Sequence, residues 1–303
     1  MEGLAVTAAA LLLFGAPSQA AREVVGHDPP GAAEPARVLG GAAAAGPAVP
    51  GSSLEARLDE VSRQLLDRPY RLGPLGEEAP PDTDPRFRLD VFDCTTYVET
   101  VLALALAGED AATSDAAAAL HWLDRVRYDG GVARYEKRRH LIDAQWIPQL
   151  VADRLVRDVT REIGGGATRT AALRLRREPW EASALHRDLG LEWSAIPAGR
   201  HTLAYLPWNV LARDDVERAL PSAAILSLVA TPTRDTPTLV THQGLLFRTP
   251  EGDLVVRHAS TRHRRVVEEP LSEFADRSRR RHGRSVLGVN ILVGSADAEA
   301  GGD

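Results

Sequence analysis

Residues 91–100 decide the fold: they read VFDCTTYVET and hold the single cysteine of the 303-residue chain. From Val98 onward, apolar residues recur at the spacing of one helix face, at positions 98, 101, 102, 105 and 106. Asp93 is a favourable N-cap residue, so the pattern predicts a helix with Cys94 in its first turn. The unpaired N–H groups and the dipole of a helix start favour a thiolate, the nucleophilic form of cysteine. A buried and inert cysteine is the alternative, because free cysteines are often core residues.

The composition is that of an ordinary soluble globular protein, with 44 % hydrophobic and 26 % charged residues. A net charge of −6 argues against nucleic acid as the main partner. The arginine-rich stretch at residues 277–284 is interpreted as a solvated helix face or loop. One cysteine excludes an intrachain disulfide and a zinc site of the CxxC type.

The two ends of the chain read as segments outside the folded domain. Residues 4–14 are a short apolar run, and small residues precede a cleavage site after Ala20, although the usual basic residues before the run are absent. We therefore expect a signal peptide at residues 1–20 and an exported, periplasmic protein. Residues 21–53 are rich in Ala, Gly and Pro and predict a disordered linker, and residues 296–303 a flexible tail. No stretch reaches the roughly 18 apolar residues of a membrane span.

Helical patterns precede strand patterns along the chain. Residues 54–66 and 115–126 predict helices before and after the cysteine helix, and residues 149–200 are interpreted as surface helices and loops. Short runs rich in β-branched residues then predict an antiparallel sheet, at residues 223–230, 239–247, 254–258, 266–267 and 286–293. Helices followed by a sheet indicate an α+β fold, with one domain over residues 54–295.

Two histidines, His242 and His258, lie in predicted strands. A histidine that exchanges a proton with a thiol, oriented by a third group, makes a helix-start cysteine a catalyst. A plain two-residue loop at residues 251–252 would place the two histidines on opposite faces of the hairpin. A loop of odd length or a bulge would place both on one face, and we predict such a loop or bulge. The alternative for each is a hydrogen-bonded, half-buried strand residue.

Residues 135–146 carry more aromatic and charged side chains than a core element needs. His140 lies near Tyr135 and Trp146 in the sequence, and the three predict a substrate-binding surface. An exposed loop histidine is the alternative interpretation of His140.

Several of these motifs resemble those of the NlpC-type cell-wall cysteine peptidases, whose fold is papain-like. They are PYRLG at residues 69–73, FDC at 92–94, His242 and HAS at 258–260. More narrowly, the chain resembles the N-acetylmuramoyl-L-alanine amidase-like branch, on residues 92–104, RYDGG at 127–131, YEKRRH at 135–140, WIP at 146–148 and GVN at 288–290. The resemblance covers about residues 70 to 292 and implies an α+β fold in which the cysteine helix packs on an antiparallel sheet.

The resemblance implies a Cys-His-His site that uses no metal and no cofactor. Cys94 would be the nucleophile, His242 the general base and acid, and His258 the group that orients His242. Tyr70 would stand beside the thiolate and, with the Cys94 backbone N–H, stabilise the oxyanion. The expected reaction is hydrolysis of the amide between N-acetylmuramic acid and L-alanine in soluble muropeptides, with no nucleic acid, membrane or protein partner implied.

Other functions stay open on the sequence. An endopeptidase of the same fold would cut within the stem peptide, typically between D-Glu and diaminopimelate, and would release different products. A metal site built from His140, His242 and His258 would make activity sensitive to chelators. In a non-catalytic sugar-binding module, replacement of Cys94 would change no measurable property.

Overall fold

The protein combines α-helices with an antiparallel sheet, as the sequence predicts. The computed structural model describes residues 52–108, 116–280 and 285–295, so the predicted signal peptide, nearly all of the predicted linker and the predicted tail lie outside the described residues. The α-helices are α2 Leu54–Gln64, α3 Cys94–Ala107, α4 Ala116–Arg127, α5 Ile147–Ala152, α6 Thr160–Gly164, α7 Arg177–Glu181, α8 Ala184–Leu189, α9 Trp208–Leu211, α10 Asp214–Ala219 and α11 Leu271–Arg279. The strands are β1 Val156–Asp158, β2 Arg169–Leu175, β3 Gly199–Pro207, β4 Ala223–Ala230, β5 Val240–Arg248, β6 Leu254–Ser260, β7 Arg265–Pro270 and β8 Val286–Gly294.

The helix predicted around the cysteine is confirmed and begins at Cys94. A reciprocal pair of hydrogen bonds fixes this start: the Asp93 carboxylate accepts from the Thr96 backbone N–H at 2.8 Å, and the Thr96 hydroxyl accepts from the Asp93 N–H at 3.0 Å. Helix α3 is buried on almost every side, beyond the single apolar face that the spacing predicts. The reason is that α2, α4, β5 and β6 all pack against it.

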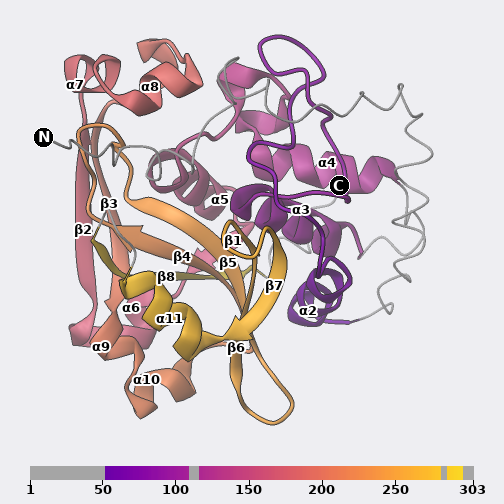
Figure 1. Ribbon diagram of the computed structural model, residues 1–303, viewed down its shortest axis with the longest axis vertical. Helices are drawn as coiled ribbons and strands as arrows, with labels where there is room; N and C mark the ends of the chain where they lie inside the picture. Colours follow the sequence, from indigo (N-terminus) through magenta and orange to yellow (C-terminus); the bar gives the residue numbers. More distant parts are fainter. Residues whose placement is uncertain (1–51, 109–115, 281–284, 296–303) are drawn as a thin grey trace, which may run out of the picture.

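The strands form one sheet in the order β2-β3-β8-β4-β5-β6-β7, with β1 paired to β8. Every pairing is antiparallel. The last strand, β8, lies between β3 and β4, so the end of the described chain completes the middle of the sheet (Figure 1). Because elements from both ends are needed for this sheet and its core, we propose that residues 54–295 form one domain.

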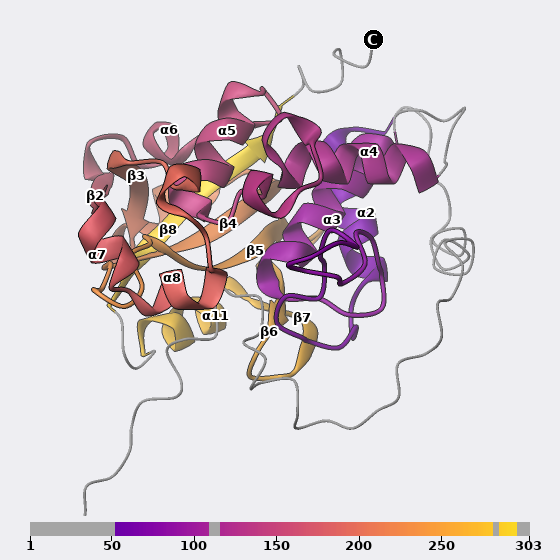
Figure 2. The same ribbon diagram turned by 90° about the horizontal axis from the view of Figure 1, so that it is seen from above.

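Alternate residues of the strands pack into two hydrophobic clusters, as expected for a sheet covered on both faces. Leu245 packs in the cluster that holds Val101 of α3. Its neighbour Leu246 packs with Val256 in the cluster that holds Phe274 of α11. Figure 2 shows the corresponding layers, with α3, α4 and α5 on one side of the sheet and α11 on the other.

The interpretation of residues 149–200 as helices and loops is wrong in part. Strands β1 and β2 lie within this segment, and β3 begins at its end. Strand β2 is at the edge of the sheet, and its side chains alternate between exposed and buried over its last six residues. An edge strand rich in Arg, Thr and Ala buries too few β-branched residues to give the usual strand signal.

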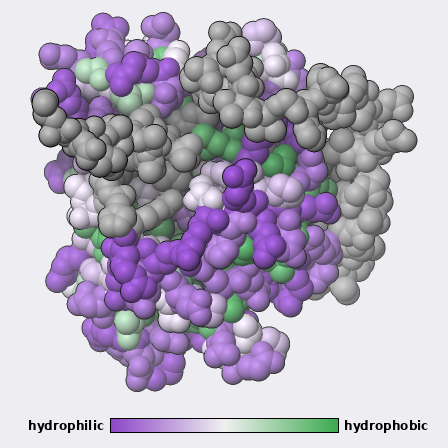
Figure 3. All heavy atoms as spheres, in the orientation of Figure 1, coloured by the Kyte–Doolittle hydropathy of each residue, from purple (hydrophilic) through white to green (hydrophobic). Residues whose placement is uncertain are grey.

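The surface is predominantly hydrophilic on the face that Figure 3 shows. Among the described residues, the exposed large hydrophobic side chains are Val132 and Val151 alone. None of the helices within the described ranges is long and apolar enough to span a membrane.

Candidate active site

Cys94, the single cysteine of the chain, has its side chain buried in the first turn of α3. It is 4 % exposed. The backbone N–H groups of this turn point toward the helix start, and the helix dipole places partial positive charge there. Both effects stabilise a thiolate relative to a thiol. The helix packs against β5 and β6, the two strands that carry the histidines singled out from the sequence.

The segment that carries Tyr70 is tied to both the cysteine loop and the sheet. Tyr70 forms a bridge with Phe92, two residues before the cysteine, and its backbone N–H donates to the Arg264 carbonyl at 2.9 Å. The Gly73 N–H donates to the second carboxylate oxygen of Asp93 at 2.9 Å. Asp93 therefore caps α3 and anchors the Tyr70 segment at once. Tyr70 is half-buried and packs against the cluster that includes α3.

The hairpin between β5 and β6 has the odd loop that the sequence predicts. Leu245 lies opposite Arg257 and Phe247 opposite Val255, and the loop between the strands is five residues long. This register places His242 and His258 on the same face of the sheet. The Nε2 atom of His242 and the Nδ1 atom of His258 are 2.8 Å apart, within hydrogen-bond distance. The structure thus brings the two predicted histidines into direct contact.

Gly244 makes room for His258 in this hairpin. A Cβ atom at position 244 would lie 3.0 Å from the His258 Cβ and 3.1 Å from the Arg257 carbonyl oxygen. The strand also carries a bulge on its other side, where Leu228 of β4 faces His242 and the next residue, Val229, faces Val240. Together, the glycine and the bulge allow His242 to reach diagonally across the hairpin to His258.

Glu269 extends the histidine pair to a series of three hydrogen-bonded side chains, and the sequence analysis does not predict it. The Nε2 atom of His258 is 2.7 Å from the Glu269 carboxylate. Strand β7 sets His258 opposite Val267 and Val256 opposite Glu269, so Glu269 is on the face of the two histidines. The signal in the sequence is an acidic residue two positions beyond the partner of His258, which requires the β6–β7 register to be known.

Arg277 of α11 makes two hydrogen bonds to Glu269. The interpretation of this arginine as part of a solvated helix face is therefore wrong, because the residue forms an ion pair at the sheet. Burial raises the pKa of Glu269, but the hydrogen bonds from His258 and Arg277 outweigh it and lower that pKa to about 2. Burial lowers the pKa of His258; Glu269 opposes this shift, and the charge of Arg277 adds to it.

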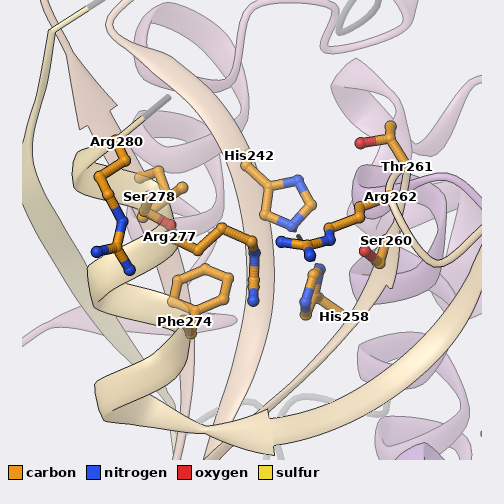
Figure 4. A pocket seen from close by; sticks show the side chains of 10 residues that line it. His242, His258, Ser260, Thr261, Arg262, Phe274, Arg277, Ser278 and Arg280 are labelled. Atoms are coloured by element: carbon orange, nitrogen blue, oxygen red, sulfur yellow. Dashed lines mark hydrogen bonds between the residues drawn. The ribbon is translucent and has the colours of Figure 1, made fainter. Parts of the chain in front are cut away.

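A cavity of about 420 Å³ opens beside the two imidazoles. Figure 4 shows His242 and His258 at its centre, Phe274 and Arg277 of α11 on one side, and Arg262 on the other. Both imidazole rings contact the Phe274 ring, with centroids 6.1 and 5.2 Å away. The lining includes three arginines and no carboxylate, and it consists of Leu228, His242, His258, Ser260, Thr261, Arg262, Phe274, Arg277, Ser278 and Arg280.

The three predicted substrate-binding residues, His140, Tyr135 and Trp146, do not line this cavity. His140 is buried and its Nε2 is 2.7 Å from the Tyr135 carbonyl oxygen, with the two rings 4.6 Å apart. The Tyr135 hydroxyl donates to the Leu189 carbonyl at 2.7 Å. Trp146 has no exposed surface and packs in the core cluster that includes α3. His140 is not the exposed loop histidine of the alternative interpretation, and the burial of all three favours a role in the core.

The metal alternative has no support in the described part of the chain. Within it, no group of three His, Cys, Asp or Glu side chains is arranged to hold a metal ion. Among the three histidines of that alternative, His242 and His258 bond to each other, whereas His140 bonds to a backbone carbonyl.

Comparison with known proteins identifies a matching family. The model of the family described as N-acetylmuramoyl-L-alanine amidase-like matches residues 60–281. No curated protein matches the chain. Among solved structures, one from Legionella pneumophila is 23 % identical, with a TM-score of 0.69, and the match covers 80 % of this chain and 90 % of that one. An N-acetylmuramoyl-L-alanine amidase from Bacteroides uniformis is also 23 % identical, with a TM-score of 0.60 and coverage of 80 % and 100 %. At these identities, the two structures show a shared fold.

Proposed function

The chain belongs to the N-acetylmuramoyl-L-alanine amidase-like family, and from this premise we propose that it is a cysteine amidase of peptidoglycan fragments. The bond cleaved is the amide between N-acetylmuramic acid and L-alanine. The observation that carries the proposal is the hydrogen-bonded series His242–His258–Glu269, whose two histidines lie on β5 and β6, the strands that pack against the cysteine helix. A papain-like, NlpC-type ancestry and export to the periplasm are parts of the same proposal.

In the first half of the reaction, the Cys94 thiol transfers its proton to His242. The thiolate attacks the carbonyl carbon of the muramyl lactyl group, and the electron pair of the carbonyl moves to its oxygen. When the tetrahedral intermediate collapses, His242 returns the proton to the nitrogen of L-alanine. The stem peptide leaves as a free amine, and the lactyl group stays on the sulfur as a thioester.

In the second half, water hydrolyses the thioester. His242 takes a proton from the attacking water, and the collapse of the second intermediate breaks the carbon–sulfur bond. The products are free N-acetylmuramic acid with its lactyl carboxylate and the regenerated thiol of Cys94. His258 keeps the imidazole of His242 in position throughout, through the 2.8 Å hydrogen bond.

Tyr70 and the Cys94 backbone N–H are the proposed donors to the oxyanion. Their placement is favoured by the anchoring of the Tyr70 segment on Asp93, the residue that caps α3. A donor aimed at the developing negative charge contributes roughly 3 kcal/mol to the stabilisation of the transition state. Tyr70→Phe, which removes only the hydroxyl, tests this role by its effect on kcat/KM.

The charge of the cavity fits a substrate that carries carboxylates. Arg262 and Arg280 line it, and neither makes an ion pair with another described residue. The stem peptides of muropeptides carry free carboxylates, which arginine side chains bind with two parallel hydrogen bonds. The chain as a whole has a net charge of −6, so this positive cavity is a local feature.

The decisive experiment incubates the full chain with a defined anhydro-muramyl tetrapeptide and identifies the products by mass spectrometry. We expect the free tetrapeptide that begins with L-alanine, and at least about a 10³-fold slower release with Cys94→Ser. A stem shortened after D-Glu, with no free tetrapeptide, would assign the endopeptidase reaction instead. Equal rates for the wild type and Cys94→Ser would overturn cysteine catalysis.

A second experiment tests whether the thiol reaches His242. Because Cys94 is the only cysteine, iodoacetamide alkylation reports on this one thiol. In the wild type we expect fast alkylation at pH 6, since imidazole would hold the sulfur as a thiolate, and His242→Ala should move the rise in rate toward the ordinary thiol pKa of about 8.5. If the alkylation rate has the same pH dependence in the wild type and in His242→Ala, Cys94 and His242 do not form an ion pair. His121→Ala, at an exposed histidine of α4, is the matched control.

A further inference from the structure

The hydrogen bonds among His242, His258 and Glu269 have a defined direction. An ionised carboxylate only accepts hydrogen bonds, so a bond between Glu269 and a histidine needs a proton on the histidine nitrogen. Arg277 makes two hydrogen bonds to the carboxylate and keeps it ionised. The His258 Nε2 atom, 2.7 Å from this carboxylate, is therefore the donor.

The proton on Nε2 decides what the other nitrogen of His258 does. Burial lowers the pKa of His258, and the charges of Arg277 and His263 act in the same direction, against the opposing effect of Glu269. In the resulting neutral ring, Nδ1 carries no proton and accepts a hydrogen bond. Its partner at 2.8 Å is the His242 Nε2 atom, which must then be protonated.

The same reasoning fixes the roles of the two ring nitrogens of His242. A neutral imidazole with its proton on Nε2 presents an acceptor at Nδ1. We propose that Glu269, held by Arg277, is a positioning residue that sets the tautomers of both histidines and so makes Nδ1 of His242 the nitrogen that takes the thiol proton. This inference rests on the proposed function for its role in catalysis. The tautomers themselves follow from the hydrogen bonds and from the neutral state of His258, without reference to catalysis.

Each alternative assignment of the His258 protons is less favourable. If His258 carried its proton on Nδ1, its Nε2 lone pair would face the Glu269 carboxylate at 2.7 Å, where two acceptors repel each other. If His258 carried two protons, Nδ1 could not accept from His242, and a second cation would lie in contact with the ring of Phe274, beside Arg277. The proposed arrangement avoids both, because the proton on Nε2 of His258 faces the carboxylate and the positive charge stays on the arginine.

The tautomers are measurable without any activity. In the Cys94→Ala variant, labelled with nitrogen-15 histidine at pH 8, two-bond nitrogen–proton couplings distinguish a proton on Nε2 from one on Nδ1. We expect His242 and His258 both to be protonated on Nε2, with their signals assigned by loss in His242→Gln and His258→Gln. In Glu269→Gln, whose amide also donates, we expect the Nδ1-protonated form of His258 to appear. A His258 protonated on Nδ1 in the parent, or tautomers that do not respond to Glu269→Gln, would overturn the proposal.

Kinetics separate this positioning role from a structural one. Loss of a group that fixes the tautomer of a catalytic histidine reduces turnover by up to about 10⁴-fold. Because Glu269 acts on His242 through the ring of His258, we expect a smaller reduction for Glu269→Gln, about 10- to 100-fold. The acid limb of the pH profile of kcat/KM should move as well, whereas KM should change less than kcat. Glu269→Asp keeps the carboxylate and should recover part of the rate. Glu273→Gln, at an exposed position of α11, is the matched control.

The two readouts also keep the proposals apart. If the couplings show the expected tautomers and no muropeptide is cleaved, the tautomer assignment stands and the amidase proposal fails. If the chain cleaves muropeptides and Glu269→Gln changes neither the couplings nor the pH profile, the amidase proposal stands and Glu269 has no positioning role. Arg277→Gln adds an independent test, since removal of its charge should raise the pH at which His258 titrates.

Discussion

Two buried histidines of this protein, His258 and His140, share the property most often used to find active sites. Burial lowers the pKa of each below the ordinary histidine value. Their partners differ. His140 bonds to a backbone carbonyl inside the core, whereas both ring nitrogens of His258 contact titratable side chains beside a cavity. A shifted pKa alone therefore does not distinguish a catalytic group from a structural one, but the chemistry of the hydrogen-bond partners does.

The largest effect that tests this contrast is expected at His242. Replacement by alanine removes the general base, and kcat/KM should fall by about 10²- to 10⁴-fold. The loss of unfolding free energy should be smaller than for a core truncation such as Trp146→Ala, because the buried ring borders a cavity on one side. Activity within threefold of the wild type would remove His242 from the mechanism. His121→Ala, on the exposed side of α4, controls for the loss of an imidazole.

At Trp146, which is buried away from the cavity as His140 is, we expect a substitution to lower stability and not to act on catalysis. Trp146 is fully buried, and its indole N–H has no hydrogen-bond partner among the described residues. Trp146→Ala should lower the free energy of unfolding by about 3–5 kcal/mol, measured by urea denaturation. Trp146→Phe, which keeps an aromatic ring and removes the N–H, should cost much less. An increase in KM with unchanged stability would instead support the predicted role in substrate binding.

The sequence predicts the part of the site that depends on local patterns. The spacing of Val98 and its neighbours, with Asp93 before them, is enough to place Cys94 at a helix start. The need to bring His242 and His258 onto one face is enough to predict an odd loop. Both inferences use periodicities of 3.6 and 2 residues, which hold without knowledge of the rest of the chain.

What the sequence does not predict depends on contacts between distant elements. Glu269 reaches His258 only through the β6–β7 register, and Arg277 reaches Glu269 only because α11 folds back on the sheet. His140 carries the same aromatic neighbours whether it is exposed or buried, so its sequence context leaves both interpretations open. Its burial follows from contacts with residues such as Leu189, which accepts the Tyr135 hydroxyl bond.

A smaller effect is expected at Gly244, which tests how tightly the histidine pair is held. A Cβ at this position would lie 3.0 Å from the His258 Cβ, so the strand or the histidine must move by a few tenths of an ångström. Gly244→Ala should cost about 1–3 kcal/mol of unfolding free energy and reduce kcat/KM as well. Gly166→Ala is the control, since a Cβ there meets nothing within 4 Å. Unchanged kcat/KM in Gly244→Ala would show that the pair tolerates displacement.

The smallest effect separates His140 from Glu269 by the pH range in which each contributes to stability. The pKa of His140 is well below 6.5 in the folded protein, so below pH 6.5 the unfolded chain binds a proton that the folded chain does not. Stability therefore falls as the pH drops below about 6.5, by up to about 1.4 kcal/mol per pH unit for one such group. The pKa of Glu269 is about 2 instead of 4.5, so its contribution is present above pH 4.5 and is lost between pH 4.5 and about 2.

Urea denaturation between pH 7 and pH 3 can resolve the two contributions. His140→Gln keeps a donor for the Tyr135 carbonyl and removes the titrating ring, so it should reduce the slope between pH 6.5 and 5 and leave kcat/KM nearly unchanged. Glu269→Gln should reduce the slope only below pH 4.5 and should lower kcat/KM. Because the pKa of His258 is also lowered, His258 likewise reduces stability as the pH falls from 6.5 to 5. The pH dependence of stability in His140→Gln should therefore become weaker in this range without disappearing. If His140→Gln lowers activity as much as Glu269→Gln does, the division between a structural and a catalytic histidine is wrong.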